Sequence, residues 1–280
     1  LFLASPPDFV IMRGTAVSTL DQAMSPAESR LSHRASRHIK EKIIESVLFL
    51  AAMVSVFTTL GIVYILVSES AVFFSHVPLW DFLTDTQWTP LFDDAHFGIM
   101  VLLSGTLVSS GVALLVAIPL GTVIAVFLSE FAGPRLREIV KPMLELLSGV
   151  PTIVYGYFAL LFVTPLLQKF MPELPGFNLL SAGLVMGIMI IPTVSSIAED
   201  AMRAVPMNLR EGSYAMGATR LQTALKVVVP AAFSGIMAAY ILGISRAVGE
   251  TMILAVAAGM QPNLTWNPLE PAATITAFIV

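Results

Sequence analysis

Five long apolar stretches alternate with polar segments along the 280-residue chain. A helix needs about 20 mostly apolar residues to cross the hydrocarbon core of a bilayer. The stretches are all far longer than the roughly 10-residue alternating segments of a membrane β-barrel. Because backbone groups find no water inside a bilayer, such runs form helices. The pattern predicts an all-α, polytopic membrane protein with five complete transmembrane helices, at about residues 43–67, 98–128, 146–168, 179–198 and 228–258.

The segments outside these spans suggest how the chain is organised. Residues 1–42 are mostly polar and are expected to form a cytoplasmic tail, which leaves 43–280 as the transmembrane domain. Residues 68–97 form a long outer loop, and residues 199–227 form a basic loop between two spans. Residues 272–280 begin another apolar run that is too short to cross. We therefore expect the chain to stop at the start of a sixth span.

Proline and glycine mark particular places in the spans. A proline inside a helix removes a backbone donor and kinks or ends the helix. Two glycines four residues apart form a small-residue face against which another helix can pack closely. The sequence therefore predicts kinks or helix ends at Pro119, Pro151, Pro165 and Pro192, and a packing face at Gly183 and Gly187.

Composition independently supports a membrane protein. The chain is 56% hydrophobic and 12% charged, and its mean hydropathy is +0.83. Soluble domains carry about 25% charged residues. A net charge of -4 gives no reason to expect a nucleic-acid partner. The chain has no cysteine, which excludes disulfides, thiol catalysis and cysteine-ligated metal.

The basic residues give the orientation. Cytoplasmic loops carry an excess of Lys and Arg. If the five spans are correct, 13 of the 15 basic residues lie on one side, in the tail and in the loops around 129–145 and 199–227. The opposite side has Lys169 and an acidic outer loop. The N-terminus and the 199–227 loop are therefore expected to be cytoplasmic.

The fifth predicted span contains two ionisable residues, Arg246 and Glu250. An Arg at the centre of a spanning helix costs roughly 2.5–3.5 kcal/mol, so it must face a partner or a polar cavity. Glu250 follows four residues later, on the same face of a continuous helix, and could pair with Arg246. The pair could be a structural ion pair or a contact to another subunit. It could also handle an anion, since the guanidinium matches phosphate or carboxylate, or act as a gate.

The basic loop carries a spaced motif. Glu211, Gly212 and Ser213 are followed by three residues and Gly217, then by nine residues and a Val-Val-Val-Pro run that ends at Pro230. We expect Glu211 to open a short helix and Gly217 to end it, because glycine permits a sharp turn. An ordinary helical hairpin between two spans would also account for the motif.

The motif resembles the coupling loop of ABC-transporter permeases, which is written Glu-Ala-Ala, three residues, Gly, nine residues, Ile, any residue, Leu-Pro. The spacing is the same here, and the residues differ at Gly212, Ser213, Val227 and Val229. Further runs resemble phosphate-specific ABC permeases over about residues 100–259. The Gly-Glu-Thr-Met run and the long outer loop resemble the PstC-type subunit family. The runs that carry this resemblance are Ser148–Gly156, Ile191–Met202, Ala204–Pro206 and Gly243–Met252.

The resemblance implies a type I ABC importer permease of the bacterial inner membrane. Such a subunit pairs with a PstA-type permease subunit and works with an ATPase dimer and an extracytoplasmic phosphate-binding protein. It implies no cofactor on this chain, because ATP and Mg are bound by the partner ATPase, and no enzymatic activity. Glu211, Gly212, Ser213, Gly217 and Pro230 would dock on the ATPase. Arg246 and Glu250 would line the phosphate path.

Three other functions are open. The chain could carry another oxyanion, such as molybdate or sulfate. It could be a secondary carrier or channel, which predicts repeats and helices interrupted near the membrane midplane. It could be a sensor or assembly subunit that docks the ATPase without conducting. An ATPase of the P-loop type is excluded, because the chain contains no Gly-Lys dipeptide.

Overall fold

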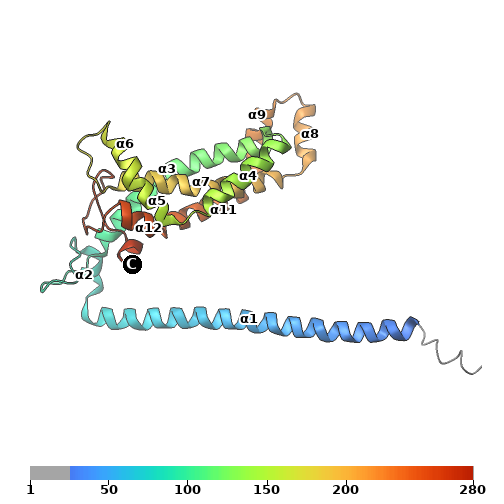
Figure 1. The fold of residues 1–280 in the computed structure, drawn as a ribbon, viewed down its shortest axis with the longest axis horizontal. Coiled ribbons are helices and arrows are strands. Elements are labelled where there is room, and N and C mark those ends of the chain that lie inside the picture. The colour runs from blue at the N-terminus through green and yellow to red at the C-terminus, as the bar shows by residue number, and fades with distance from the viewer. Residues whose placement is uncertain (1–25, 280) are drawn as a thin grey trace, which may run out of the picture. The chain divides into compact units, whose positions relative to one another are not determined.

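The computed structural model describes the backbone of residues 26–279 and the side chains of residues 41–279 (Figure 1). The described chain is predominantly helical, and its only β pairing is an isolated bridge between Trp88 and Phe97. The chain divides into two compact units, one ending at His76 and the other beginning at Val77. The first unit consists of a single helix in its described part, and the second contains the other helices.

Helix α1 runs from Pro26 to His76, well beyond the predicted first span at both ends. Residues 26–42, which were assigned to the tail, are therefore helical and continuous with the first span. Ala, Glu, Arg and Lys are frequent there, and these residues favour helix. Residues 1–25 lie outside the described residues. Residues 68–76, which were assigned to the loop after the first span, are also part of α1.

Helices α3 (Ile99–Val126) and α7 (Leu179–Arg203) form the centre of the second unit and pack along each other. The glycine pair of α7 lies at this contact. A Cβ at Gly183 would come within 2.8 Å of the Val112 side chain, and one at Gly187 within 2.8 Å of the Ala113 carbonyl oxygen. The predicted packing face is therefore confirmed. Only residues without a side chain allow the two backbones to approach this closely.

The remaining helices surround this pair or cap its ends. They include three five-residue π-helical segments, labelled η. In chain order they are α2 (Leu79–Thr84), η1 (Phe127–Phe131), α4 (Pro134–Ser148), α5 (Thr152–Phe158), η2 (Ala159–Val163), α6 (Thr164–Gln168), α8 (Met207–Ala215), α9 (Arg220–Thr223), η3 (Ala224–Val228), α10 (Val229–Ala231), α11 (Phe233–Val248), α12 (Met252–Ala257) and α13 (Ile275–Phe278).

The number of predicted spans agrees with the structure, but the continuity of two of them does not. Three helices in the described part are long and apolar enough to cross a membrane, or five if each bent helix pair counts as one span. The third predicted span is preceded by α4 and turns by 87° between Ser148 and Thr152. Pro151 lies in this turn, where it lacks the backbone donor that a continuous helix requires.

The fifth predicted span is interrupted twice. The chain bends by 75° between Ala231 and Phe233, and α11 ends at Val248, before α12 begins at Met252. Pro119 and Pro192, in contrast, lie inside the continuous helices α3 and α7. The basic loop is also shorter than predicted, because α7 continues to Arg203.

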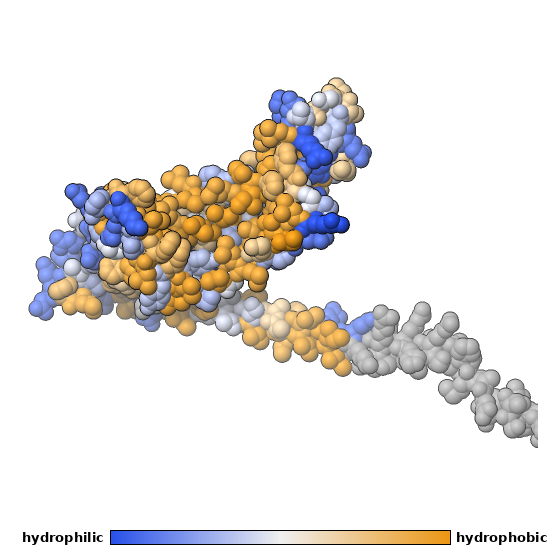
Figure 2. Space-filling view, turned by 45° about the horizontal axis from the view of Figure 1, so that its top comes forward, coloured by the Kyte–Doolittle hydropathy of each residue, from blue (hydrophilic) through white to orange (hydrophobic). Residues whose placement is uncertain are grey.

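Polar residues gather at the two ends of the second unit, and the flank seen in Figure 2 is largely apolar. One end carries α8 and α9, which belong to the basic loop, and the other carries α2 and α6 (Figure 1). An apolar flank between polar ends is the arrangement expected of a helical body that crosses a bilayer.

The short helix predicted in the basic loop is present as α8, although it begins at Met207 rather than at Glu211. Pro206 directly precedes it. Proline has no backbone N–H, and this is tolerated at the start of a helix because the first N–H groups have no partner within the helix. Gly217 has a φ of +83° and ends the helix, with its N–H donating to the Tyr214 carbonyl at 2.9 Å. The predicted glycine turn is confirmed, since this φ favours glycine.

The segment between α2 and α3 is closed by a small polar network. The Thr89 N–H donates to the His96 carbonyl at 2.9 Å, and the Gly98 N–H donates to the Gln87 carbonyl at 2.8 Å. His96 Nδ1 lies 2.7 Å from the Asp85 carboxylate. The hydrogen bond with Asp85 raises the pKa of His96. The Gln87 N–H and then His96 lower the pKa of Asp85.

The two glycines of the basic loop give opposite predictions for replacement by alanine. Gly212 lies inside α8 with open space around it, so Gly212→Ala should stabilise the helix by about 0.5–1 kcal/mol. Gly217→Ala should cost about 1–2 kcal/mol, because a Cβ strains the left-handed conformation. Hydrogen exchange of the α8 amides measures both effects. Equal protection in the two variants would contradict this description of the turn.

The segment between α2 and α3 should be most ordered at mildly acidic pH. Because the pKa of His96 is raised in the folded segment, its stabilising contribution is complete below about pH 6.5 and is lost as pH rises through the raised value. The contribution of Asp85, whose pKa is lowered, disappears only as pH falls below its ordinary value of 3.8.

Amide exchange at Thr89 and Gly98, corrected for intrinsic rates, should therefore show more protection at about pH 5.5 than at about pH 8.5. A His96→Gln variant serves as the control and should lose this pH difference. Equal protection of the unmodified chain at the two pH values would show that the pair does not hold the segment.

Candidate functional site

Arg246 lies in the last turn of α11, about 20 Å along the helix axis from Phe233. Its side chain is partly buried, and Nη1 donates to the Thr193 hydroxyl of α7 at 3.2 Å. Among the described residues, no carboxylate lies within ion-pair distance of its guanidinium. Arg246 therefore carries a charge within the apolar helices that no described carboxylate neutralises.

The predicted pairing of Glu250 with Arg246 is wrong, because α11 ends at Val248 and Glu250 lies outside it. Glu250 is buried and faces the start of the next helix. One carboxylate oxygen accepts hydrogen bonds from the N–H groups of Met252 and Ile253, at 3.1 and 3.3 Å. Its backbone carbonyl accepts from the Thr276 hydroxyl at 2.6 Å. Glu250 thus satisfies free donors at the N-terminus of α12.

This arrangement leaves Arg246 available to bind an anion. Arg has five N–H donors in a planar fork, and one of them contacts Thr193. A negatively charged group at the guanidinium would offset the cost of placing its charge inside the membrane. The contact with Thr193 could not be predicted, because nothing in a single sequence shows which residue of α7 faces α11.

Two helices that each follow an interruption lie side by side. These are α5, after the turn at Pro151, and α12, after the break that ends α11. A Cβ at Gly156 of α5 would come within 3.0 Å of the Val256 side chain and 3.2 Å of the Met252 carbonyl. Helices interrupted inside the span were expected of a secondary carrier, and they are present here. This feature therefore does not separate a carrier from an ABC permease.

The predicted coupling residues are partly brought together. Glu211 and Gly212 lie on the exposed surface of α8, and the Ser213 hydroxyl is 2.9 Å from the Thr223 hydroxyl near the end of α9. Gly217 forms the turn between α8 and α9. Pro230 lies further along, in α10, just before the 75° bend. The loop thus presents an exposed helix whose two ends are fixed.

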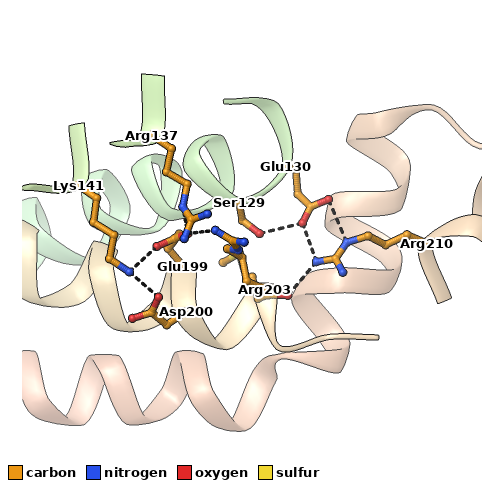
Figure 3. Close-up of polar contacts among 9 residues, drawn as sticks. Ser129, Glu130, Arg137, Lys141, Glu199, Asp200, Arg203 and Arg210 are labelled. Carbon is orange, nitrogen blue, oxygen red and sulfur yellow. Dashed lines mark hydrogen bonds and ion pairs between the residues drawn. The ribbon is translucent and has the colours of Figure 1, made fainter. Parts of the chain in front are cut away.

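A buried ion pair behind α8 was not predicted from the sequence. Figure 3 shows Arg210 directed at Glu130, which lies in η1 at the end of α3. Nη2 of Arg210 lies 3.0 Å from the Glu130 carboxylate, and the two side chains are 10% and 4% exposed. Arg210 also donates to the carbonyls of Val205 and Met202, at 2.5 and 2.9 Å.

A second buried cluster connects α4 with α7. Glu199 of α7 is fully buried and lies 2.7 Å from Nε of Arg137 and 3.0 Å from Nζ of Lys141. Lys141 also contacts Asp200 at 2.5 Å, and Arg203 lies 3.8 Å from Glu199 (Figure 3). From the sequence, these basic residues indicated only the orientation of the chain. The adjacent acidic residues Glu199 and Asp200 were the one feature of the sequence that could have indicated pairing with cations from another segment.

These two clusters border a cavity of about 1140 Å³ between α4 and α8, which includes Arg137, Arg203, Arg210 and Arg220 in its wall. Within the part of the chain that the structure describes, no three His, Asp or Glu side chains are grouped to hold a metal ion. The chemistry of this end consists of charge pairing and hydrogen bonding between helices.

Comparisons with known proteins place this architecture in a family. Residues 117–271 match the family described as "Binding-protein-dependent transport system inner membrane component". The chain is 35% identical over 258 residues to the probable ABC transporter permease protein YqgH of Bacillus subtilis, with 91% of this chain and 84% of that protein covered. It is 34% identical over 219 residues to the phosphate transport system permease protein PstC of Mesorhizobium japonicum, with 71% of this chain covered.

The match spans 66% of the length of that PstC relative, just under two thirds. Among solved structures, a chain of the MetNI methionine ABC transporter in inward-facing conformations gives a TM-score of 0.45 at 24% identity, with 58% of this chain and 74% of that chain covered. The family match and the curated relatives lead to one conclusion. The chain belongs to the family of binding-protein-dependent transport system inner membrane components.

Proposed function

We propose that this chain is a membrane-spanning subunit of an ATP-driven phosphate importer, in which it forms part of the translocation path. Membership of the permease family makes it a transport subunit, with ATP hydrolysis on a separate subunit. The names of its PstC relatives support phosphate as the substrate. The observation that carries the proposal is Arg246, a cation inside the spans without a carboxylate partner in the described chain.

The proposed complex contains a second, PstA-type permease subunit, an ATPase dimer that binds ATP and Mg, and an extracytoplasmic phosphate-binding protein. The chain would lie in the bacterial inner membrane with its N-terminus and the α8 end in the cytoplasm. The distribution of basic residues supports this orientation. In this arrangement residues 43–280 form the permease domain, and the exposed α8 with Glu211 meets the ATPase.

Transport in this proposal is a shared conformational equilibrium. Binding of ATP to the partner and opening of the path near Arg246 are linked states, so each biases the other. Arg246 would hold the anion while the path changes its open side. Glu250 would fix the interruption between α11 and α12, because it occupies the backbone donors that a moving segment would otherwise expose.

Two alternatives differ in what they predict. A permease for molybdate or sulfate would use the same guanidinium, since all three substrates are tetrahedral oxyanions, and anion competition separates them. A sensor that docks the ATPase without conducting would need no charge at Arg246. The secondary carrier is disfavoured, because the chain belongs to a family of binding-protein-dependent systems.

Replacement of Arg246 tests the proposal. Hydrogen bonds to charged groups contribute about 1.5–3 kcal/mol, which corresponds to roughly a 10- to 150-fold change in an equilibrium. Arg246→Gln should therefore reduce phosphate uptake at least about tenfold in liposomes that contain the assembled complex. Arg246→Lys should retain part of the activity, because it keeps the charge but loses the fork.

Arg135→Gln is the matched control, because Arg135 is exposed at the start of α4, and it should transport at the unmodified rate. Unchanged uptake by an assembled Arg246→Gln complex would rule out the transport role of this residue. Stronger inhibition of uptake by molybdate or sulfate than by unlabelled phosphate would favour the other oxyanions.

A further inference from the structure

Arg210 precedes Glu211 in α8 but points to the opposite side of the helix. Glu211 is exposed, whereas Arg210 is buried and is the only buried residue of α8. Successive residues of a helix are about 100° apart, so α8 offers one side to water and Arg210 to the protein body. The attachment of this helix to the spans therefore depends on a charged side chain rather than on an apolar face.

The guanidinium joins three elements. It meets the Glu130 carboxylate of η1, the Met202 carbonyl in the last turn of α7 and the Val205 carbonyl just beyond that turn. The last carbonyls of a helix have no partner within the helix, and a cation is favourable there. Only a planar fork supplies donors in several directions from one rigid group.

Glu130 is held in place for this contact. It lies in the π-helical turn that ends α3, and the Ser129 hydroxyl donates to its carboxylate at 2.8 Å. In the same region, Glu199 attaches α4 to α7 through Arg137 and Lys141 (Figure 3). The ends of α3, α4 and α7 are thus connected to one another and to α8 by buried charges.

We propose that Arg210 is the positioning residue that transmits movement of α8 to α3 and α7. This inference rests on the proposed function, in which α8 receives the ATPase. Breaking a buried ion pair is costly because it leaves the other charge without compensation. A displacement of α8 therefore carries Glu130 and the end of α7 with it.

The test compares variants of the full complex in liposomes, with ATP hydrolysis and phosphate uptake measured together. Arg210→Gln should lower the phosphate moved per ATP at least fivefold in complexes that still retain the ATPase subunits on purification. The double variant Glu130→Gln with Arg210→Gln removes both charges, so it leaves no uncompensated charge. It should remain uncoupled, because neither the ion pair nor the charged fork is restored.

Arg210→Lys keeps the charge but cannot reach all three acceptors, so its phosphate-to-ATP ratio should be intermediate. Arg135→Gln, at the same end of the protein but exposed, should keep the unmodified ratio. If Arg210→Gln fails to assemble, the assignment is judged from the phosphate-to-ATP ratios of the double variant and of Arg210→Lys. An unmodified ratio in the double variant, or hydrolysis and uptake that fall in parallel, would overturn the assignment.

The unmodified complex tests the proposed function separately. If it moves molybdate or sulfate but not phosphate, the proposed substrate is wrong. The same variants are then compared with that anion, and the assignment of Arg210 is judged by the same ratio.

Discussion

A charge inside an apolar helical body must find a partner, because an unpaired buried charge costs several kcal/mol. At one end of this protein the requirement is met across elements: Glu199 of α7 takes cations from α4, and Glu130 at the end of α3 takes Arg210 from α8. Arg246 has no carboxylate partner among the described residues, and its charge is the feature that the proposed substrate would satisfy.

The interrupted helices meet the same requirement, namely that polar groups inside the helical body have partners. A break inside a span frees backbone donors and acceptors, and these need partners from the protein itself. At the break between α11 and α12 the Glu250 carboxylate accepts two N–H groups, and Thr276 donates to the Glu250 carbonyl. The Glu250 carboxylate is therefore directed at the break, and among the described residues it forms no ion pair with Arg246. The position of Glu250 therefore stabilises the break between α11 and α12 and also leaves Arg246 available to an anion.

The sequence predicted the features that depend on local rules. The number of spans follows from hydropathy once bent pairs are counted, Gly217 from the turn that it permits, and the packing face from the spacing of Gly183 and Gly187. The break at the third span was predicted from Pro151, which lies in the 87° turn. The two breaks in the fifth span were missed, because hydropathy over some twenty residues is insensitive to a few irregular ones. The pairs Arg210–Glu130 and Lys141–Glu199 join residues 80 and 58 positions apart. No periodicity within one segment specifies such pairs, although buried acidic residues near a membrane surface imply that cations reach them.

Distance measurement between spin labels distinguishes an α8 that is fixed to the end of α3 from a loosely attached helix. The chain has no cysteine, so labels can be introduced at single exposed positions such as Val123 of α3 and Met216 beside α8. In the assembled complex, the distance between these two labels should be the same without nucleotide and with ATP trapped. A distance that changes with nucleotide while Glu130 and Arg210 are intact would contradict transmission through this pair.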